Sequence, residues 1–334
     1  MRDARAFASV CAGIGALLFS GCGKDSSPAG SGGTSGPVGT GGSGELWDAG
    51  DRGVGGAITD ASPDVSIVAS IDAEEYASLD GPSGCGLASA PAGVFNDQTI
   101  TVGGQARTYV LSVPKTYDPS TPLSLVFAWH GSGGSGFKVR QLFALEPAAA
   151  GSAIFVYPDA AGSGWDWSPT GIDVALFDAL VNYLTGSYCI DRNRILSTGL
   201  SHGAFFTNVL GCCRGNVLRA IAPVAGGPPN AAACAGRVGA WVAHAANDGL
   251  VDFNTFGVGT RDFWIASNGC STTLAPVATG PGDCVEYQGC LPDLPVVWCV
   301  HSEGHAWPSM ANCYDGGVCF DAGPAIWAFF ARFE

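Results

Sequence analysis

One serine stands in a setting that suits nucleophilic catalysis. Residues 199–203 read G-L-S-H-G, and the pattern G-x-S-x-G holds a serine in a sharp turn between a strand and a helix. The chain has 50 glycines, so chance matches are common and the context has to decide. An apolar strand at 194–198 and an apolar helix at about 202–211 favour a nucleophilic Ser201 over an ordinary serine N-cap.

A serine nucleophile needs a general base, and histidine is the usual one. Beyond the elbow residue His202, three of the five histidines follow Ser201, namely His244, His301 and His305. The order Ser…Asp…His disfavours His244, which precedes the expected acid. His305 lies deeper in the loop after an expected strand, so we choose it as the base and keep His301 as the alternative. A zinc site at this pair is disfavoured because a glycine and a proline beside it oppose a helix.

The acid that orients the base is expected on the loop after the strand at 238–243. Asp248 lies there, at the carboxyl end of a strand, where a carboxylate can hold the imidazole in its working tautomer. Asp252 is the alternative within the same loop. An ordinary solvated aspartate is the simpler explanation for either residue.

Negative charge that develops during acyl transfer needs backbone N–H donors. One donor is expected from His202, directly after the nucleophile and at the start of a helix. The other is expected from residues 130–133, H-G-S-G, which follow an apolar strand at 123–129. Ser132 is our choice for this second donor, since the glycines let the backbone approach a substrate. A glycine-rich turn without function is the alternative.

Apolar runs alternate with helical patterns from residue 85 onward, which indicates the elements that position these residues. Such alternation predicts an α/β fold with a mostly parallel central sheet flanked by helices. Helices are expected at 173–188, 202–211 and 325–333, and strands at 108–113, 123–129, 153–157, 194–198, 220–224, 238–243 and 296–300.

The composition excludes several classes of partner and cofactor. A formal charge of −14 argues against nucleic acid and against docking on an anionic membrane surface. Thirteen cysteines indicate an oxidising compartment. Their spacing shows no paired pattern for structural zinc, and we expect neither a metal nor another cofactor.

The N-terminal region predicts export. Residues 1–21 have the basic start and short apolar run of a signal peptide, and Cys22 stands where a bacterial lipoprotein is lipidated. Residues 22–82 are Gly/Ser-rich and then acidic, as in a disordered tether, which leaves 83–334 as the folded domain. We expect a protein outside the cell or on its outer surface, secreted or held at the membrane only through Cys22.

An ordered series of segments resembles the feruloyl esterase and polyhydroxybutyrate depolymerase-like group of secreted α/β-hydrolase esterases. It includes YCIDRNR at 188–194 and GHAWP at 304–308, with further matches at 83–86, 107–111, 117–119, 262–264, 268–270, 287–290, 297–299 and 326–330. The resemblance supports a triad of Ser201, Asp248 and His305.

The resemblance also implies substrate contacts, and this chain departs from the family pattern in places. It marks Trp165 and Trp167 as aromatic residues of a substrate loop, and we add His130 and Trp307 as candidate contacts. The second elbow position usually carries Tyr or Asn, where this chain has His202. Other departures are Ala245 in place of Gly, Asp252 in place of Pro, and an insertion around Cys313 and Cys319.

The resemblance suggests one disulfide, Cys290–Cys299. Proximity along the chain suggests weaker pairings, and Cys213 is left without a partner once Cys11 is removed with the signal and Cys22 is used as the anchor. These weaker pairings are Cys270–Cys284, Cys212–Cys234 and Cys313–Cys319. Separately, we expect Cys85 to reach back to Cys189.

Together these features predict a monomeric, exported carboxylic ester hydrolase with a Ser-His-Asp triad and an acyl-enzyme intermediate. The substrates implied by the resemblance are feruloyl or acetyl esters of plant polysaccharide such as xylan. A depolymerase-like esterase for short-chain polyhydroxyalkanoates is the alternative, and a peptidase on the same fold is disfavoured. Outside the enzymes, the alternative is a non-catalytic, polysaccharide-binding surface lipoprotein.

Overall fold

A central sheet organises the part of the chain that the computed structural model describes, residues 83–87, 90–314 and 316–333. Its strand order is β1-β2-β4-β3-β5-β6-β7-β10-β9-β8. Neighbours from β4 to β10 pair in parallel, whereas β1, β2, β9 and β8 add antiparallel edges. The strands are β1 Gly93–Val102, β2 Gln105–Val113, β3 Leu123–Trp129, β4 Ala153–Pro158, β5 Ile190–Leu200, β6 Ala220–Val224, β7 Gly239–Ala245, β8 Val277–Ala278, β9 Asp283–Glu286 and β10 Val296–His301.

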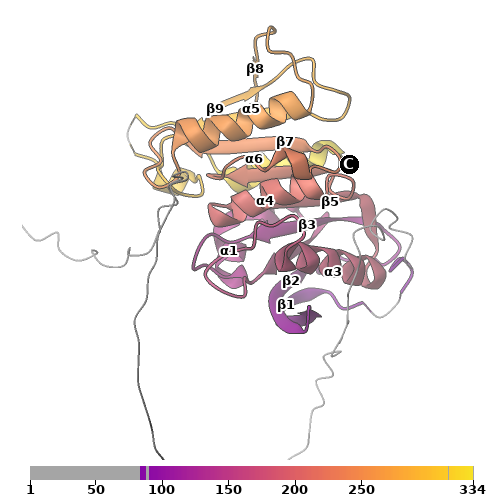
Figure 1. Ribbon diagram of the computed structural model, residues 1–334. Helices are drawn as coiled ribbons and strands as arrows, with labels where there is room; N and C mark the ends of the chain where they lie inside the picture. Colours follow the sequence, from indigo (N-terminus) through magenta and orange to yellow (C-terminus); the bar gives the residue numbers. More distant parts are fainter. Residues whose placement is uncertain (1–82, 88–89, 315, 334) are drawn as a thin grey trace, which may run out of the picture. The chain divides into compact units, whose positions relative to one another are not determined.

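Helices cover both faces of this sheet (Figure 1). The buried residues of α3, α4 and α5 join one core cluster, and those of α1, α2 and α6 join the other. Successive residues of the buried strand β3 alternate between the two clusters, as the period of a strand requires. The helices are α1 Gly136–Phe143, α2 Leu145–Ala149, α3 Ile172–Ser187, α4 His202–Cys213, α5 Val258–Ser267 and α6 Ala322–Phe330.

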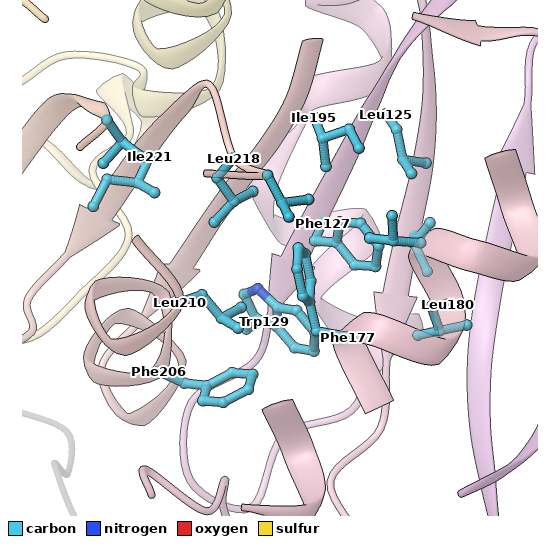
Figure 2. Close-up of a cluster of buried hydrophobic side chains, with 14 of the residues drawn as sticks. Leu125, Phe127, Trp129, Phe177, Leu180, Ile195, Phe206, Leu210, Leu218 and Ile221 are labelled. Carbon is cyan, nitrogen blue, oxygen red and sulfur yellow. The ribbon is translucent and has the colours of Figure 1, made fainter. Parts of the chain in front are cut away.

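Aromatic side chains at the end of β3 form the centre of one core (Figure 2). The ring of Trp129 stacks on Phe127 at 5.6 Å and meets Phe206 of α4 edge-on at 4.8 Å. Its indole Nε1–H donates to Ser197 Oγ of β5 at 2.9 Å. This bond satisfies a buried donor and aligns the carboxyl ends of β3 and β5, from which two parts of the expected site emerge.

The observed topology confirms the predicted α/β class, and it is that of the α/β-hydrolase fold. The strands expected at 123–129 and 220–224 have the predicted bounds, and the helix at 173–188 is displaced by one residue. The sequence did not predict α1, α2, α5, β1 or the short strands β8 and β9, each of which buries three residues or fewer. The boundaries at residues 21 and 82, the predicted tether and Cys22 lie outside the described residues. No described helix is long and apolar enough to span a membrane.

The disulfides correct the one pairing taken from the resemblance. Cys290 bonds to Cys270, and Cys299 bonds to Cys284, so both predicted Cys290–Cys299 and Cys270–Cys284 are wrong. The reason is the antiparallel register of β9 and β10, which places Cys284 directly opposite Cys299. The pairings Cys85–Cys189, Cys212–Cys234 and Cys313–Cys319 and the free Cys213 are confirmed.

A single substitution tests this connectivity. In Cys284→Ser, the broken bridge leaves Cys299 as the new free thiol, and alkylation of the denatured, non-reduced protein followed by peptide mass mapping labels Cys299 in addition to Cys213. The matched variant Cys290→Ser exposes Cys270 instead. New labelling of Cys270 in Cys284→Ser would show that the pairing described here is incorrect.

Candidate active site

The turn at Ser201 is a strained junction between β5 and α4. Its backbone adopts φ 56° and ψ −121°, a conformation that costs a non-glycine residue of the order of 1–3 kcal/mol. The surrounding backbone holds it in place: the Ser201 N–H donates to the Val224 carbonyl at 2.9 Å, and the Ser201 carbonyl accepts from Ala204 and Phe205. Such strain exposes a serine at the end of a strand, as in a nucleophile elbow.

The two flanking glycines are required by close backbone packing. A Cβ on Gly199 would lie 2.4 Å from the Gly203 carbonyl oxygen, and a Cβ on Gly203 would lie 2.3 Å from that of Trp129. No side chain fits at such distances. This turn therefore needs glycine on both sides of Ser201.

The loop after β3 lies directly against the serine. A Cβ added to Gly131 would come within 3.3 Å of Ser201 Cβ, so the glycine permits the close approach. His130 is buried beneath this loop, where its ring Nδ1 donates to the Gly131 carbonyl at 2.7 Å and its Nε2 accepts from the Ala160 N–H at 3.1 Å. Burial lowers the pKa of His130, which suits this neutral tautomer.

His130 thus supports the loop from inside rather than facing a substrate. Asp159 also anchors the loop, because its carboxylate accepts from the N–H of Gly136 at 2.7 Å and from the Thr108 hydroxyl at 2.8 Å. Ser132, the residue expected to donate to the oxyanion, is exposed next to Gly131.

A carboxylate–imidazole pair lies at the carboxyl ends of β7 and β10. The Nδ1 of His305 lies 2.8 Å from Oδ2 of Asp248, whose side chain is fully buried. The other oxygen, Oδ1, accepts from the N–H groups of Leu250 and Val251 at 2.8 and 2.9 Å. Burial alone would raise the pKa of Asp248, but these donors and the His305 ring outweigh it and lower that pKa. The carboxylate is therefore ionised and its position is fixed.

His244 is a second contact of this carboxylate, which the sequence reasoning had set aside. Its Nε2 lies 2.9 Å from the Val251 carbonyl and 3.4 Å from Asp248 Oδ2. Burial lowers the pKa of His244, so the ring remains neutral and supports the acid loop. In the sequence, the available sign of this contact was that His244 precedes Asp248 by only four residues.

The alternatives for base and acid lie elsewhere. His301 is buried in the core and packs near Phe320, and burial lowers its pKa to about 4. Asp252 is exposed, and its side chain caps the turn that follows by accepting from the Thr255 N–H at 2.7 Å. The geometry thus joins His305 to Asp248 rather than either alternative.

The three candidate substrate tryptophans differ in exposure. Trp165 is 4% exposed and donates its indole N–H to the His130 carbonyl at 2.8 Å. Trp307 is 3% exposed and stacks on Phe143 of α1. Both are core residues, and their burial argues against direct contact with a substrate. Trp167 is 40% exposed and lies over His202 and Phe205 at the start of α4.

Metal ligands do not gather at this site. Among the described residues, no group of three or more His, Cys, Asp or Glu side chains is placed to hold an ion. The arrangement offers a strained serine, an imidazole held on a buried carboxylate and two nearby backbone segments, which together suit acyl transfer.

Comparison with curated proteins finds several feruloyl esterases. No protein-family model matches the chain. The chain is 34% identical over 273 residues to feruloyl esterase D of Neurospora crassa, covering 75% of this chain and 90% of that protein. It is 32% identical over 235 residues to feruloyl esterase C of Emericella nidulans, covering 67% and 83%.

Solved structures show the same fold. An acetyl xylan esterase from Aspergillus awamori superimposes with a TM-score of 0.51 and 15% identity, covering 68% of this chain and 94% of that chain. A ferulic acid esterase superimposes with a TM-score of 0.50 and 15% identity, covering 72% and 98%. At these identities the structures support the fold alone.

The packing of the elbow can be tested without an activity assay. In Gly203→Ala, the added methyl group meets the carbonyl oxygens of Trp129 and His130, and such overpacking costs about 1–3 kcal/mol or more. We expect a lower free energy of unfolding in urea. Gly162→Ala is the matched control, because no atom lies within 4 Å of its added Cβ, and an equal loss in both variants would contradict the packing argument.

Proposed function

Because this chain belongs to the feruloyl esterase family and is therefore a serine carboxylic ester hydrolase, we propose that it cleaves feruloyl or acetyl esters of plant polysaccharide through Ser201, His305 and Asp248. One observation carries the assignment of the triad: the buried Asp248 carboxylate holds His305 Nδ1 at 2.8 Å. Ser201, Asp248 and His305 follow β5, β7 and β10. These strands run parallel, so the three residues share one edge of the sheet.

The geometry assigns a task to each ring nitrogen of the base. With Nδ1 donating to Asp248, Nε2 of His305 is the nitrogen that takes the proton of Ser201 as its Oγ attacks the ester carbonyl. The same nitrogen then protonates the leaving alcohol, and the acyl-enzyme forms. Water, activated by Nε2, releases the acid in the second half of the reaction. Asp248 stays ionised and stabilises the imidazolium.

Two backbone segments are available to the oxyanion. The N–H of His202 stands at the first turn of α4, where the helix dipole favours negative charge. The second donor is the N–H of Ser132, in the loop that Gly131 brings against Ser201. Because His130 and Asp159 fix this loop from below, its donors require little reorganisation during the reaction.

Trp167 supplies the exposed aromatic surface nearest to the elbow. Its indole lies 4.2 Å from the ring of His202, the residue directly after the nucleophile. A flat aromatic face suits a feruloyl ring or the apolar face of a sugar. Trp165 and Trp307 are buried and support the walls of the site instead. No observation favours a polyester substrate.

The disulfides, rather than the enzyme site, support the proposal that the protein is exported. Five bridges among the described residues support an oxidising compartment outside the cell. Lipidation of Cys22 rests on the sequence motif alone and stays a prediction, as does the monomeric state.

Loss of the nucleophile tests the proposal directly. The oxidised full-length protein and Ser201→Ala are compared on methyl ferulate and a small activated acetate ester, with Ser120→Ala as control, since Ser120 is an exposed residue before β3 at the opposite end of the sheet. We expect Ser201→Ala to lose about 10³-fold or more of kcat, because triad members act as a unit. Retained activity in Ser201→Ala would identify another nucleophile.

The assignment of the acid has its own test. Asp248→Asn places an amide donor against His305 Nδ1 and favours the wrong tautomer, which lowers kcat by about 10³- to 10⁴-fold in a comparable triad. Asp252→Asn changes an exposed helix cap, so we expect its kcat to remain near that of the unmodified protein. Steady-state kinetics on methyl ferulate distinguish the two, and a larger loss in Asp252→Asn would reverse the assignment.

A further inference from the structure

The imidazole of His202 has a contact that catalysis does not require. Its Nδ1 accepts the backbone N–H of Trp165 at 2.9 Å. The backbone of Gly164 packs closely against the same ring. A Cβ added to Gly164 would come within 2.6–2.9 Å of three ring atoms of His202. The loop that carries Trp167 is therefore fastened to the elbow residue through a ring nitrogen that must be unprotonated to accept.

Two further contacts connect His202 to Trp167 itself. The Trp167 indole lies over the His202 ring at 4.2 Å with a 33° tilt, and its Nε1–H donates to the His202 carbonyl at 3.3 Å. It also stacks on Phe205 at 4.7 Å and 21°. His202 and Phe205 are three residues apart and share one face of α4. Trp167 covers both, which leaves its outer face to solvent.

The rest of the loop is anchored further from the elbow. Trp165 donates its indole N–H to the His130 carbonyl at 2.8 Å, and the Asp166 N–H donates to Asp173 of α3 at 2.6 Å. These bonds fix the base of the loop. The orientation of Trp167 depends on His202 more directly than on any of them.

We propose that His202 is a positioning residue that holds Trp167 in place for substrate only while its imidazole is neutral. The inference rests on the proposed function, because it takes Trp167 as a substrate-binding surface. Protonation of Nδ1 replaces the acceptor with a second donor facing the Trp165 N–H. The loop is then released, and the affinity for an aromatic or polysaccharide ester falls.

The charges around the ring set the pH range. Burial is the largest influence and lowers the pKa of His202; the nearby His130 lowers it further, whereas Asp173 raises it. Asp166 belongs to the fastened loop, Arg107 of β2 pairs with Asp173, and the first turn of α4 contains no titratable side chain other than that of His202. The contact is thus complete above the ordinary histidine pKa of about 6.5 and is lost as the pH falls through the lowered pKa of the folded protein.

Two variants of the full-length protein separate acceptor from ring. His202→Asn keeps an acceptor, because Asn Oδ1 occupies nearly the position of Nδ1, and it does not titrate. His202→Phe keeps an aromatic ring under Trp167 but has no acceptor. Amide hydrogen–deuterium exchange of the peptide that contains Trp165 reports whether its N–H is bonded to His202, and it needs no catalysis. The KM for methyl ferulate reports the effect of that bond on substrate binding. Both are measured between about pH 7.5 and 4.5, on either side of the ordinary pKa.

We expect the unmodified protein to lose protection at Trp165 in acid, beyond the intrinsic pH effect on exchange, while KM rises about threefold to tenfold, the effect of one lost hydrogen bond. His202→Asn should stay protected with a KM that does not change with pH, and His202→Phe should be unprotected with a raised KM throughout. Because amide exchange at Trp165 is measured without turnover, it reports the contact independently of the catalytic steps that enter KM.

Either of two results would overturn the proposal: protection at Trp165 in His202→Phe equal to that of the unmodified protein, or an acid response that persists in His202→Asn. If the protein cleaves no ester at all, the proposed function fails. The exchange data still decide whether His202 fastens the loop.

Discussion

Close backbone contact between the start of α4 and the end of β3 is the constraint on which the site depends. Gly203 packs so tightly against the carbonyls of Trp129 and His130 that even a methyl group does not fit. This contact places the helix that follows Ser201 directly beside the loop after β3. Ser201 and both candidate oxyanion donors therefore lie at one junction, and the strain at Ser201 is sustained by the packing around it.

The site combines one buried carboxylate with several neutral histidines. Asp248 is fully buried and accepts from two backbone N–H groups and the ring of His305. Burial lowers the pKa of both His244 and His301, so the core near the carboxylate gains no competing positive charge. Because burying an unpaired charge is costly, the donors around Asp248 compensate for the burial of its carboxylate.

Covalent bonds stabilise the edge of the sheet beyond β10, where burial is small. The strands β8 and β9 have two and four residues, too few to hold a register by hydrophobic packing. Cys284–Cys299 joins β9 to β10, and Cys270–Cys290 joins the end of α5 to the loop that follows β9. Restricting the unfolded chain in this way stabilises segments that have little core of their own.

The class of fold and the candidates for catalysis could be predicted from the amino-acid sequence, because both depend on local pattern. The apolar runs at 123–129 and 220–224 predicted their strands, since each is short and belongs to an alternation of strand and helix patterns. Ser201 could be chosen because strand, turn and helix are consecutive in the chain.

Contacts between residues far apart in the chain could be assigned only from the tertiary structure. It joined Asp248 to His305 rather than to His301, since strand order and loop path set which side chains meet. It paired Cys284 with Cys299 through the register of β9 on β10, which proximity along the chain does not reveal. It also buried Trp165 while leaving Trp167 exposed, because the direction in which each side chain of a loop points is set by the surfaces that pack against it.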